Sequence, residues 1–173
     1  MFELNRSIEI LERTPTVLRT MLEGISEGWY SRNEGENTWS PYDVIGHLIH
    51  GERTDWIPRL NIIFAESGNK IFAPFDRFAQ FEESRGKTLQ NLLDEFDELR
   101  NQNLQVVRSK NIKESDLTRT AMHPALGEVN LRNLLATWTA HDLNHIGQIV
   151  RVMAKQYKED VGPWAAYLRV MQG

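Results

Sequence analysis

The feature that most constrains the fold is a helical period of apolar residues that recurs four times along the chain. Apolar side chains repeat at spacings of three and four residues in segments at about 4–25, 40–64, 84–109 and 130–157. Each residue turns an α-helix by about 100°, so this spacing gathers the apolar side chains on one helical face. The period-two pattern of a half-buried strand is nearly absent. The sequence therefore predicts an all-α fold, a four-helix bundle.

Capping residues and prolines predict where these helices begin and bend. Ser40 is expected to be the N-cap of the second helix, and Asn130 the N-cap of the fourth. Pro15 is expected to kink the first helix or to start a new turn, and Pro58 to bend the second. Residues 164–171 are a candidate for a short C-terminal fifth helix packed on the outside.

Residues 67–83 lack a regular period and are rich in phenylalanine. We interpret this stretch as an ordered crossover between the second and third helices, held in place by its aromatic side chains. The length of 173 residues suits one hydrophobic core, so a single domain spanning residues 1–173 is expected.

Composition excludes several classes of function. The net charge of −4 and the lack of a block dense in lysine and arginine disfavour nucleic-acid binding. No run of about 18 apolar residues occurs, so no membrane span is expected. The first residues, Met1 to Arg6, lack the features of a secretory signal, and a cytoplasmic location is expected. The chain has no cysteine, so a metal would be bound by His, Asp or Glu.

Two histidines four residues apart, His141 and His145, form the most specific pattern. They lie on the same side of the fourth helix as Leu134, which faces the core, so both imidazoles can reach one metal ion. The alternative is a pair of buried histidines bonded to polar neighbours. His47, at the edge of the apolar face of the second helix, is the candidate third ligand. Three neutral imidazoles would leave a divalent metal with an open position, as in catalytic sites.

The other polar candidates are weaker. His50 is interpreted as solvent-facing, and His123 as a loop residue whose surface role is favoured over one at the mouth of a pocket. The string His-Asp-x-x-His is similar to the His-Glu-x-x-His pattern of zinc proteases, but aspartate is one methylene shorter, so peptide hydrolysis is disfavoured. Asp43, Glu52 and Asp142 are equal candidates to accept the free N–H of a ligand imidazole.

Nearly the whole chain resembles the DinB-like (DinB/YfiT-like) superfamily of four-helix-bundle metalloenzymes. The segment Trp39–Leu48 is similar to the family's Trp-Ser segment that leads into a first ligand histidine, and Glu52 follows at the familiar offset. The segment His141–Ile149 is similar to the part that carries the second and third ligands, followed by Ile-Gly-Gln-Ile. His123-Pro124, followed by a glycine, matches the part before the last helix.

The resemblance implies an up-down-down-up bundle with a long crossover between helices two and three. It implies that His47, His141 and His145 bind a divalent metal, with Zn or Ni expected and Mn or Fe as alternatives. It also implies a homodimer. Characterised members of the family include bacillithiol-dependent thiol-S-transferases and a mycothiol-dependent maleylpyruvate isomerase.

The favoured hypothesis is a metal-dependent transferase whose partners are a low-molecular-weight thiol and an electrophile. A metal with an open position would lower the pKa of the thiol, and no cysteine of the chain itself can supply the sulfur. The alternatives are a metal-dependent hydrolase and a stress-response binding or structural module without catalysis. Four arginines are candidates to bind carboxylates of the thiol, although surface solvation is favoured for each: Arg32, Arg53, Arg59 and Arg77.

Overall fold

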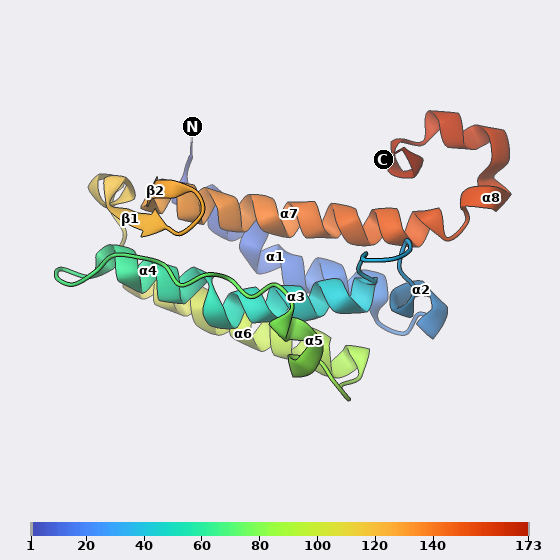
Figure 1. Ribbon diagram of the computed structural model, residues 1–173, viewed down its shortest axis with the longest axis horizontal. Coiled ribbons are helices and arrows are strands. Elements are labelled where there is room, and N and C mark those ends of the chain that lie inside the picture. The colour runs from blue at the N-terminus through green and yellow to red at the C-terminus, as the bar shows by residue number, and fades with distance from the viewer. Residues whose placement is uncertain (1, 173) are drawn as a thin grey trace.

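The computed structural model describes residues 2–172 and contains a bundle of four long helical segments (Figure 1). They are α1 (Leu4–Leu22), α3 (Pro41–Thr54) continued by α4 (Trp56–Phe64), α6 (Leu89–Ser109) and α7 (Leu131–Lys155). Helices α1 and α7 run in one direction, and α3–α4 and α6 run in the other (Figure 1). The up-down-down-up order expected from the sequence is confirmed.

Shorter elements connect and extend the bundle. The two strands β1 (Thr120–His123) and β2 (Gly127–Asn130) form an antiparallel hairpin in which Thr120 pairs with Asn130 and His123 with Gly127. The sequence did not predict this hairpin, because strands of four residues are too short to show a clear alternation. The short elements, in chain order, are α2 (Glu27–Ser31), α5 (Ala79–Glu83), η1 (Glu114–Thr118), β1 (Thr120–His123), β2 (Gly127–Asn130), α8 (Lys158–Val161), η2 (Gly162–Tyr167) and η3 (Arg169–Met171).

The helix starts follow the capping signals, and the two prolines act differently from each other. Ser40 and Asn130 each cap their helix through a capping box, as predicted. Pro15 lies inside an α1 that continues from Leu4 to Leu22. The second long segment is interrupted at Asp55 and continues to Phe64, as expected from Pro58. Pro58 has no amide hydrogen for the carbonyl of Thr54, four residues earlier, so α3 ends there.

The crossover from α4 to α6 runs back along the bundle and is tied to the hairpin (Figure 1). The Phe72 amide donates to the Met122 carbonyl at 2.9 Å, and the Met122 amide donates to the Lys70 carbonyl at 2.7 Å. Phe72 is buried, as expected for an aromatic anchor, but Phe78 and Phe81 are 61% and 41% exposed. Backbone pairing and one phenylalanine thus hold this end of the crossover.

A layer of buried polar residues divides the apolar core into two clusters. One cluster lies at the hairpin end and includes Leu11, Leu104 and Trp138. The other lies toward the opposite end and includes Leu18 and Phe96. Between them along the helices lie buried polar side chains, which include Thr14, Glu52, Arg100, Asp142 and His145. This polar layer is where the bundle departs from a simple hydrophobic interior.

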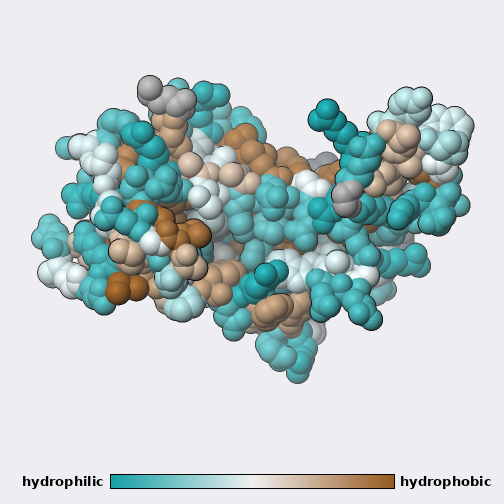
Figure 2. All heavy atoms as spheres, turned by 45° about the horizontal axis from the view of Figure 1, so that its top comes forward, coloured by the Kyte–Doolittle hydropathy of each residue, from teal (hydrophilic) through white to brown (hydrophobic). Residues whose placement is uncertain are grey.

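The C-terminal segment ends in short turns instead of one fifth helix. It comprises α8, η2 and η3, and stands out from the bundle as a lobe of its own (Figure 1, Figure 2). Trp164 and Tyr167 on this segment are 71% and 87% exposed. Among residues 2–172, no helix has the length and apolar character needed to cross a membrane.

Candidate metal centre

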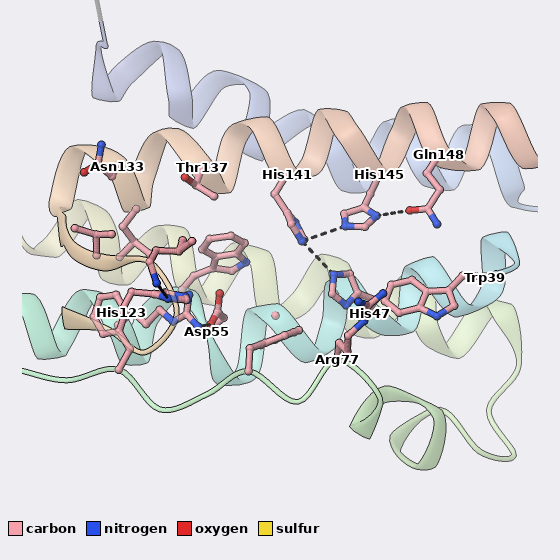
Figure 3. Close-up of a pocket in the computed structure, with 18 of the residues that line it drawn as sticks. Trp39, His47, Asp55, Arg77, His123, Asn133, Thr137, His141, His145 and Gln148 are labelled. Carbon is pink, nitrogen blue, oxygen red and sulfur yellow. Dashed lines mark hydrogen bonds and ion pairs between the residues drawn. The ribbon is translucent and has the colours of Figure 1, made fainter. Parts of the chain in front are cut away.

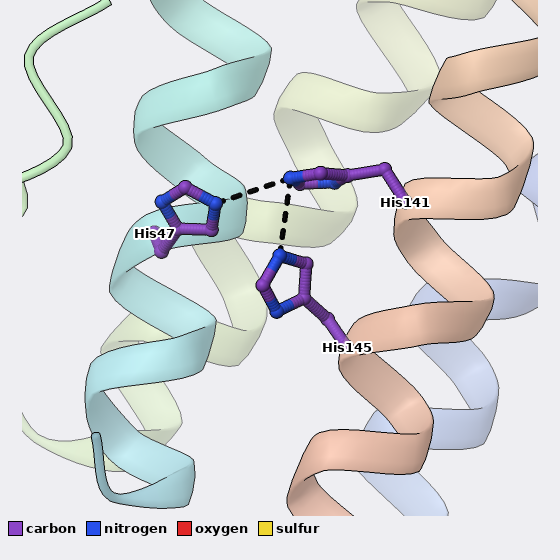
Figure 4. Close-up of side chains that lie close together, drawn as sticks. All are labelled: His47, His141 and His145. Atoms are coloured by element: carbon purple, nitrogen blue, oxygen red, sulfur yellow. Dashed lines mark hydrogen bonds between the residues drawn. The ribbon is translucent and has the colours of Figure 1, made fainter. Parts of the chain in front are cut away.

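The structure brings His47, His141 and His145 together at one point (Figure 4). His47 projects from α3, and the other two project from successive turns of α7. The Nε2 atom of His141 lies 3.1 Å from the Nε2 atom of His47 and 3.1 Å from that of His145. One ligand nitrogen from each ring lies within 4.8 Å of the other two.

The donor set fits a divalent metal in both spacing and charge. A tetrahedral ion with metal–nitrogen bonds of about 2.0–2.1 Å separates its ligand nitrogens by about 3.3 Å, close to the two observed distances. Burial lowers the pKa of His47 to about 3 and that of His141 to about 2, and burial also lowers the pKa of His145. The imidazoles are therefore neutral at physiological pH, the state in which they bind metals.

The second ring nitrogen of His145 has a partner that fixes its tautomer. Its Nδ1–H donates to the Gln148 side-chain oxygen at 2.8 Å, which leaves a lone pair on Nε2 for a cation. The Nδ1 atoms of His47 and His141 are buried and have no hydrogen-bond partner within residues 2–172. The three predicted carboxylates do not take this role: Asp43 caps α3 at Ser40, and Glu52 and Asp142 bind Arg100.

Arg100 forms the centre of the polar layer next to the histidines. Its guanidinium donates twice to Asp142, at 2.6 and 3.0 Å, and twice to Glu52, at 3.1 and 2.7 Å. It also donates to the Leu11 carbonyl at 2.7 Å. Pro15 has no amide hydrogen to bond this carbonyl, so the proline in α1 provides an acceptor for Arg100.

The charge of this layer favours a cation beside it. Burial raises the pKa of Glu52, and the Arg100 guanidinium opposes that shift. Two carboxylates facing one guanidinium leave one formal negative charge within the bundle, next to three neutral imidazoles. Since Asp142 directly follows His141, its bidentate bond to Arg100 also fixes the orientation of α7 at the ligands. Both oxygens of the Asp142 carboxylate accept from Arg100, so this carboxylate does not point to the metal site to activate a water molecule. The zinc-protease pattern therefore does not apply.

The three histidines line a cavity of about 560 Å³ (Figure 3). Helix α7 forms one side of the cavity, and α3 and α4 form the other. One end is lined by Glu34, Trp39, Arg77, Gln148 and Arg151. The end near the hairpin is lined by Asp55, Arg59, Phe72, His123, Leu126 and Thr137. The cavity is large enough for a small organic substrate.

Two other histidines differ from their predicted places. His50 is 5% exposed, and its Nδ1 lies 3.0 Å from a Glu83 carboxylate oxygen, so the solvent-facing interpretation is wrong. Helix α5 covers this side of α3, which a helical wheel of α3 alone cannot indicate. His123 lines the cavity, so the favoured surface role is wrong as well. Its Nδ1 accepts the amides of Ala125 and Leu126, which leaves the ring proton on Nε2.

Two tryptophans separate the cavity from the core. Trp138 is 1% exposed and donates its indole N–H to Glu52 at 3.0 Å, as expected for a core residue. Trp56 stacks on it at 5.4 Å between ring centroids and contacts the His141 ring edge-on at 5.2 Å. Trp56 is therefore the tryptophan that walls the site on this side.

Sequence and structure comparisons agree with this architecture. Residues 10–149 match the model of the DinB superfamily. The chain belongs to the DinB superfamily. No curated protein sequence matches it. A similar solved structure is that of YfiT from Bacillus subtilis, described as a probable metal-dependent hydrolase with an unusual four-helix bundle topology. The two share 20% sequence identity with a TM-score of 0.74 over 88% of this chain and 86% of YfiT, which shows a common fold.

Proposed function

We propose that this DinB superfamily protein is a metal-dependent transferase that joins a low-molecular-weight thiol to an electrophile. The observation that carries the proposal is the convergence of three neutral imidazole nitrogens on the wall of a cavity of about 560 Å³. A divalent cation held by His47, His141 and His145 would lower the pKa of a thiol that binds it, so that the thiolate is available near neutral pH. Zn or Ni is the expected metal.

The residues of the cavity support a nucleophile that comes from outside the chain. The protein has no cysteine. The one hydroxyl-bearing residue near the hairpin end, Thr137, has no base bonded to it among the described residues. A cavity of this volume holds more than a water molecule, so it has room for parts of two reactants.

Arg77 is the arginine best placed to bind a carboxylate of the thiol. It lines the cavity near His47, and its guanidinium lies 5.4 Å from the ring centroid of Trp39. Within residues 2–172 it has no carboxylate partner. By contrast, Arg59 pairs with Asp55, and Arg53 pairs with carboxylates outside the cavity. Arg77 thus provides an unpaired positive charge beside the metal centre.

A metal-dependent hydrolase is the second candidate, favoured by the description of YfiT. The same three-histidine site would lower the pKa of a bound water molecule. The two candidates differ in one requirement, because the transferase needs a thiol and the hydrolase does not. A third alternative, a module in which the metal only stabilises the fold, would turn over neither an electrophile with thiol nor a hydrolysable substrate.

The test is turnover by protein loaded with Zn or Ni. Monobromobimane serves as the electrophile, with bacillithiol, glutathione or no thiol, and a nitrophenyl ester serves as the hydrolysis substrate. We expect bimane conjugation that depends on both thiol and metal, and that is lost in His141→Ala. Arg77→Ala should raise the KM for the thiol more than it lowers kcat. Ester turnover without thiol would support the hydrolase, and no turnover of either substrate would contradict both enzymes.

A further inference from the structure

Asp55 is a carboxylate in the cavity wall that the metal centre does not use. It lies where α3 ends and α4 begins, and it is 8% exposed. An aspartate at the start of a helix usually caps it, but the side chain of Asp55 accepts no capping hydrogen bond. Figure 3 shows its carboxylate pointing into the space between His123 and the metal-site histidines.

The two oxygens of Asp55 have different surroundings. Oδ1 pairs with the Arg59 guanidinium at 2.7 Å, and both side chains are 12% exposed. Oδ2 has no hydrogen-bond partner among residues 2–172, and Asp55 lines the cavity. A carboxylate that is mostly buried and only half satisfied has an oxygen available to a substrate.

We propose that Asp55 is the acid–base residue of the site, which accepts a proton from the incoming nucleophile and delivers it to the leaving group. This inference rests on the proposed function. In thiol transfer, Asp55 takes the proton of the S–H group. The sulfur then forms a bond to carbon, and the bond between that carbon and its leaving group breaks. The proton passes from Asp55 to the leaving group, so that RSH and R′X become RSR′ and HX. In hydrolysis, water replaces the thiol and the proton follows the same route.

The other titratable groups of the cavity suit this task less well. The nitrogen lone pairs of the metal-site imidazoles would bind the cation, so they are not available to accept a proton. Glu34 is the second carboxylate in the cavity wall, and it binds Arg151 at 2.7 Å and Lys155 at 3.1 Å. These two cations lower the pKa of Glu34, whereas burial raises the pKa of Asp55 to about 6. Of the two cavity carboxylates, Asp55 is therefore the one whose pKa lies closer to neutral pH, which suits an acid–base role.

The charged groups around Asp55 predict how its titration responds to substitution. Arg59 on α4 and His50 on α3 lower its pKa, against the larger effect of burial. His123 on β1 lines the same end of the cavity, and Asp76 on the crossover lies by the adjoining depression that Asp55 also lines. The cavity-lining residues of α7 near this end are uncharged. Replacing Arg59 by a neutral residue should therefore raise the pKa of Asp55.

The test combines kinetics with a direct titration of the carboxyl group. The variants are Asp55→Asn, Arg59→Gln and the control Glu128→Gln, which removes a charge from the exposed side of the hairpin. Metal content, circular dichroism and the pH profile of kcat/KM are measured for each metal-loaded protein. Carbon-13 NMR of aspartate-labelled protein follows the carboxyl groups with pH.

In the wild type, kcat/KM should fall as the pH drops through about 6, because the protonated carboxyl cannot accept a proton. Asp55→Asn should lose this limb and about 10²–10⁴-fold in kcat/KM while keeping its metal. It should also lose one aspartate resonance that titrates near that pH. Arg59→Gln should move the limb to higher pH, and Glu128→Gln should leave it in place.

Three results would overturn the role of Asp55: turnover in Asp55→Asn within about threefold of wild type, a limb that persists in that variant, or a limb that Arg59→Gln does not move. Each of these presupposes an active wild type, so each leaves the proposed function intact. Absence of turnover in the metal-loaded wild type would instead overturn the proposed function, and the proton-transfer role with it.

Discussion

Replacement of Arg100 by methionine should destabilise the protein far more than the loss of one arginine normally does. Arg100 is 1% exposed and joins Glu52, Asp142 and the Leu11 carbonyl in one network. Methionine retains much of the side-chain volume but leaves two carboxylates buried without their cation. Breaking a buried ion pair by removing one partner costs about 3–5 kcal/mol.

This free energy corresponds to a large shift in melting temperature. For domains of about 150–250 residues, 1 kcal/mol shifts Tm by about 2–4 °C, so Arg100→Met should lower Tm by about 6–20 °C. The control is Arg108→Met, since Arg108 lies on the same helix and pairs with Glu12 at the surface, where the two side chains are 49% and 42% exposed. Exposed pairs contribute about 0–1 kcal/mol.

Urea unfolding followed by circular dichroism, with EDTA present to keep metal out of the comparison, measures both variants. The triple variant Arg100→Met, Glu52→Gln and Asp142→Asn should recover part of the loss, because it removes the uncompensated charges. An Arg100→Met protein that loses no more free energy of unfolding than Arg108→Met would refute the reasoning.

Three further predictions concern the metal site and the packing of its helices. Gln148→Leu should weaken Zn binding by about 10–100-fold, because it removes the oxygen that accepts the Nδ1–H of His145. Competition with a chelator measures the affinity, and Gln102→Leu, at an exposed position, is the control. Burial lowers the pKa of His141 to about 2 in the folded protein, below its value in the unfolded chain. The apo-protein therefore has its full stability above about pH 6.5, and it loses stability as the pH falls toward the folded pKa, because only the unfolded chain takes up the proton. Between pH 6 and 4 the wild type should therefore lose about 1.4 kcal/mol more per pH unit than His141→Gln, and equal slopes in urea unfolding would contradict this. Gly147→Ala has open space around its Cβ and should stabilise α7 by about 0.5–1 kcal/mol. Gly46→Ala should stabilise α3 less, because its Cβ would lie 2.5 Å from the Ser84 hydroxyl oxygen and 3.2 Å from the Gln80 side-chain oxygen, which must both move; thermal melts that show an equal gain for both would count against this packing.

The helices and the histidine cluster could be predicted because their signals are local. The period of apolar residues identifies the faces of four long segments, and Ser40 and Asn130 identify two starts through capping chemistry. The pair His141 and His145 lies on one face by helix geometry alone. Resemblance to the family supplied the topology that brings His47 to the pair.

Other features depend on contacts between distant parts of the chain. His50 faces away from the apolar stripe of its own helix, and only α5 makes that side buried. His123 lies in a loop by sequence, but the hairpin and the crossover place it in the cavity wall.

One missed feature did leave a signal in the sequence. Arg100 lies four residues after Phe96 and four before Leu104, inside the apolar stripe of α6. A charged residue in that position indicates a buried ion pair. Glu52 interrupts the apolar face of the second segment in the same way, and Asp142 that of the fourth, and both pair with Arg100. Pro15 is part of the same pattern, since it leaves the Leu11 carbonyl free for Arg100. Reading these interruptions together would have predicted the polar layer.

The most direct test of the account is the metal content of the purified protein. The wild type is produced in medium supplemented with Zn, Ni, Mn and Fe, and bound metal is quantified by mass spectrometry alongside His141→Ala and the control His50→Ala. The account predicts about one equivalent of a divalent metal in the wild type and in His50→Ala, and a loss of metal in His141→Ala with the helical content retained. A wild type without metal, or an equal metal content in all three folded proteins, would contradict a centre formed by His47, His141 and His145.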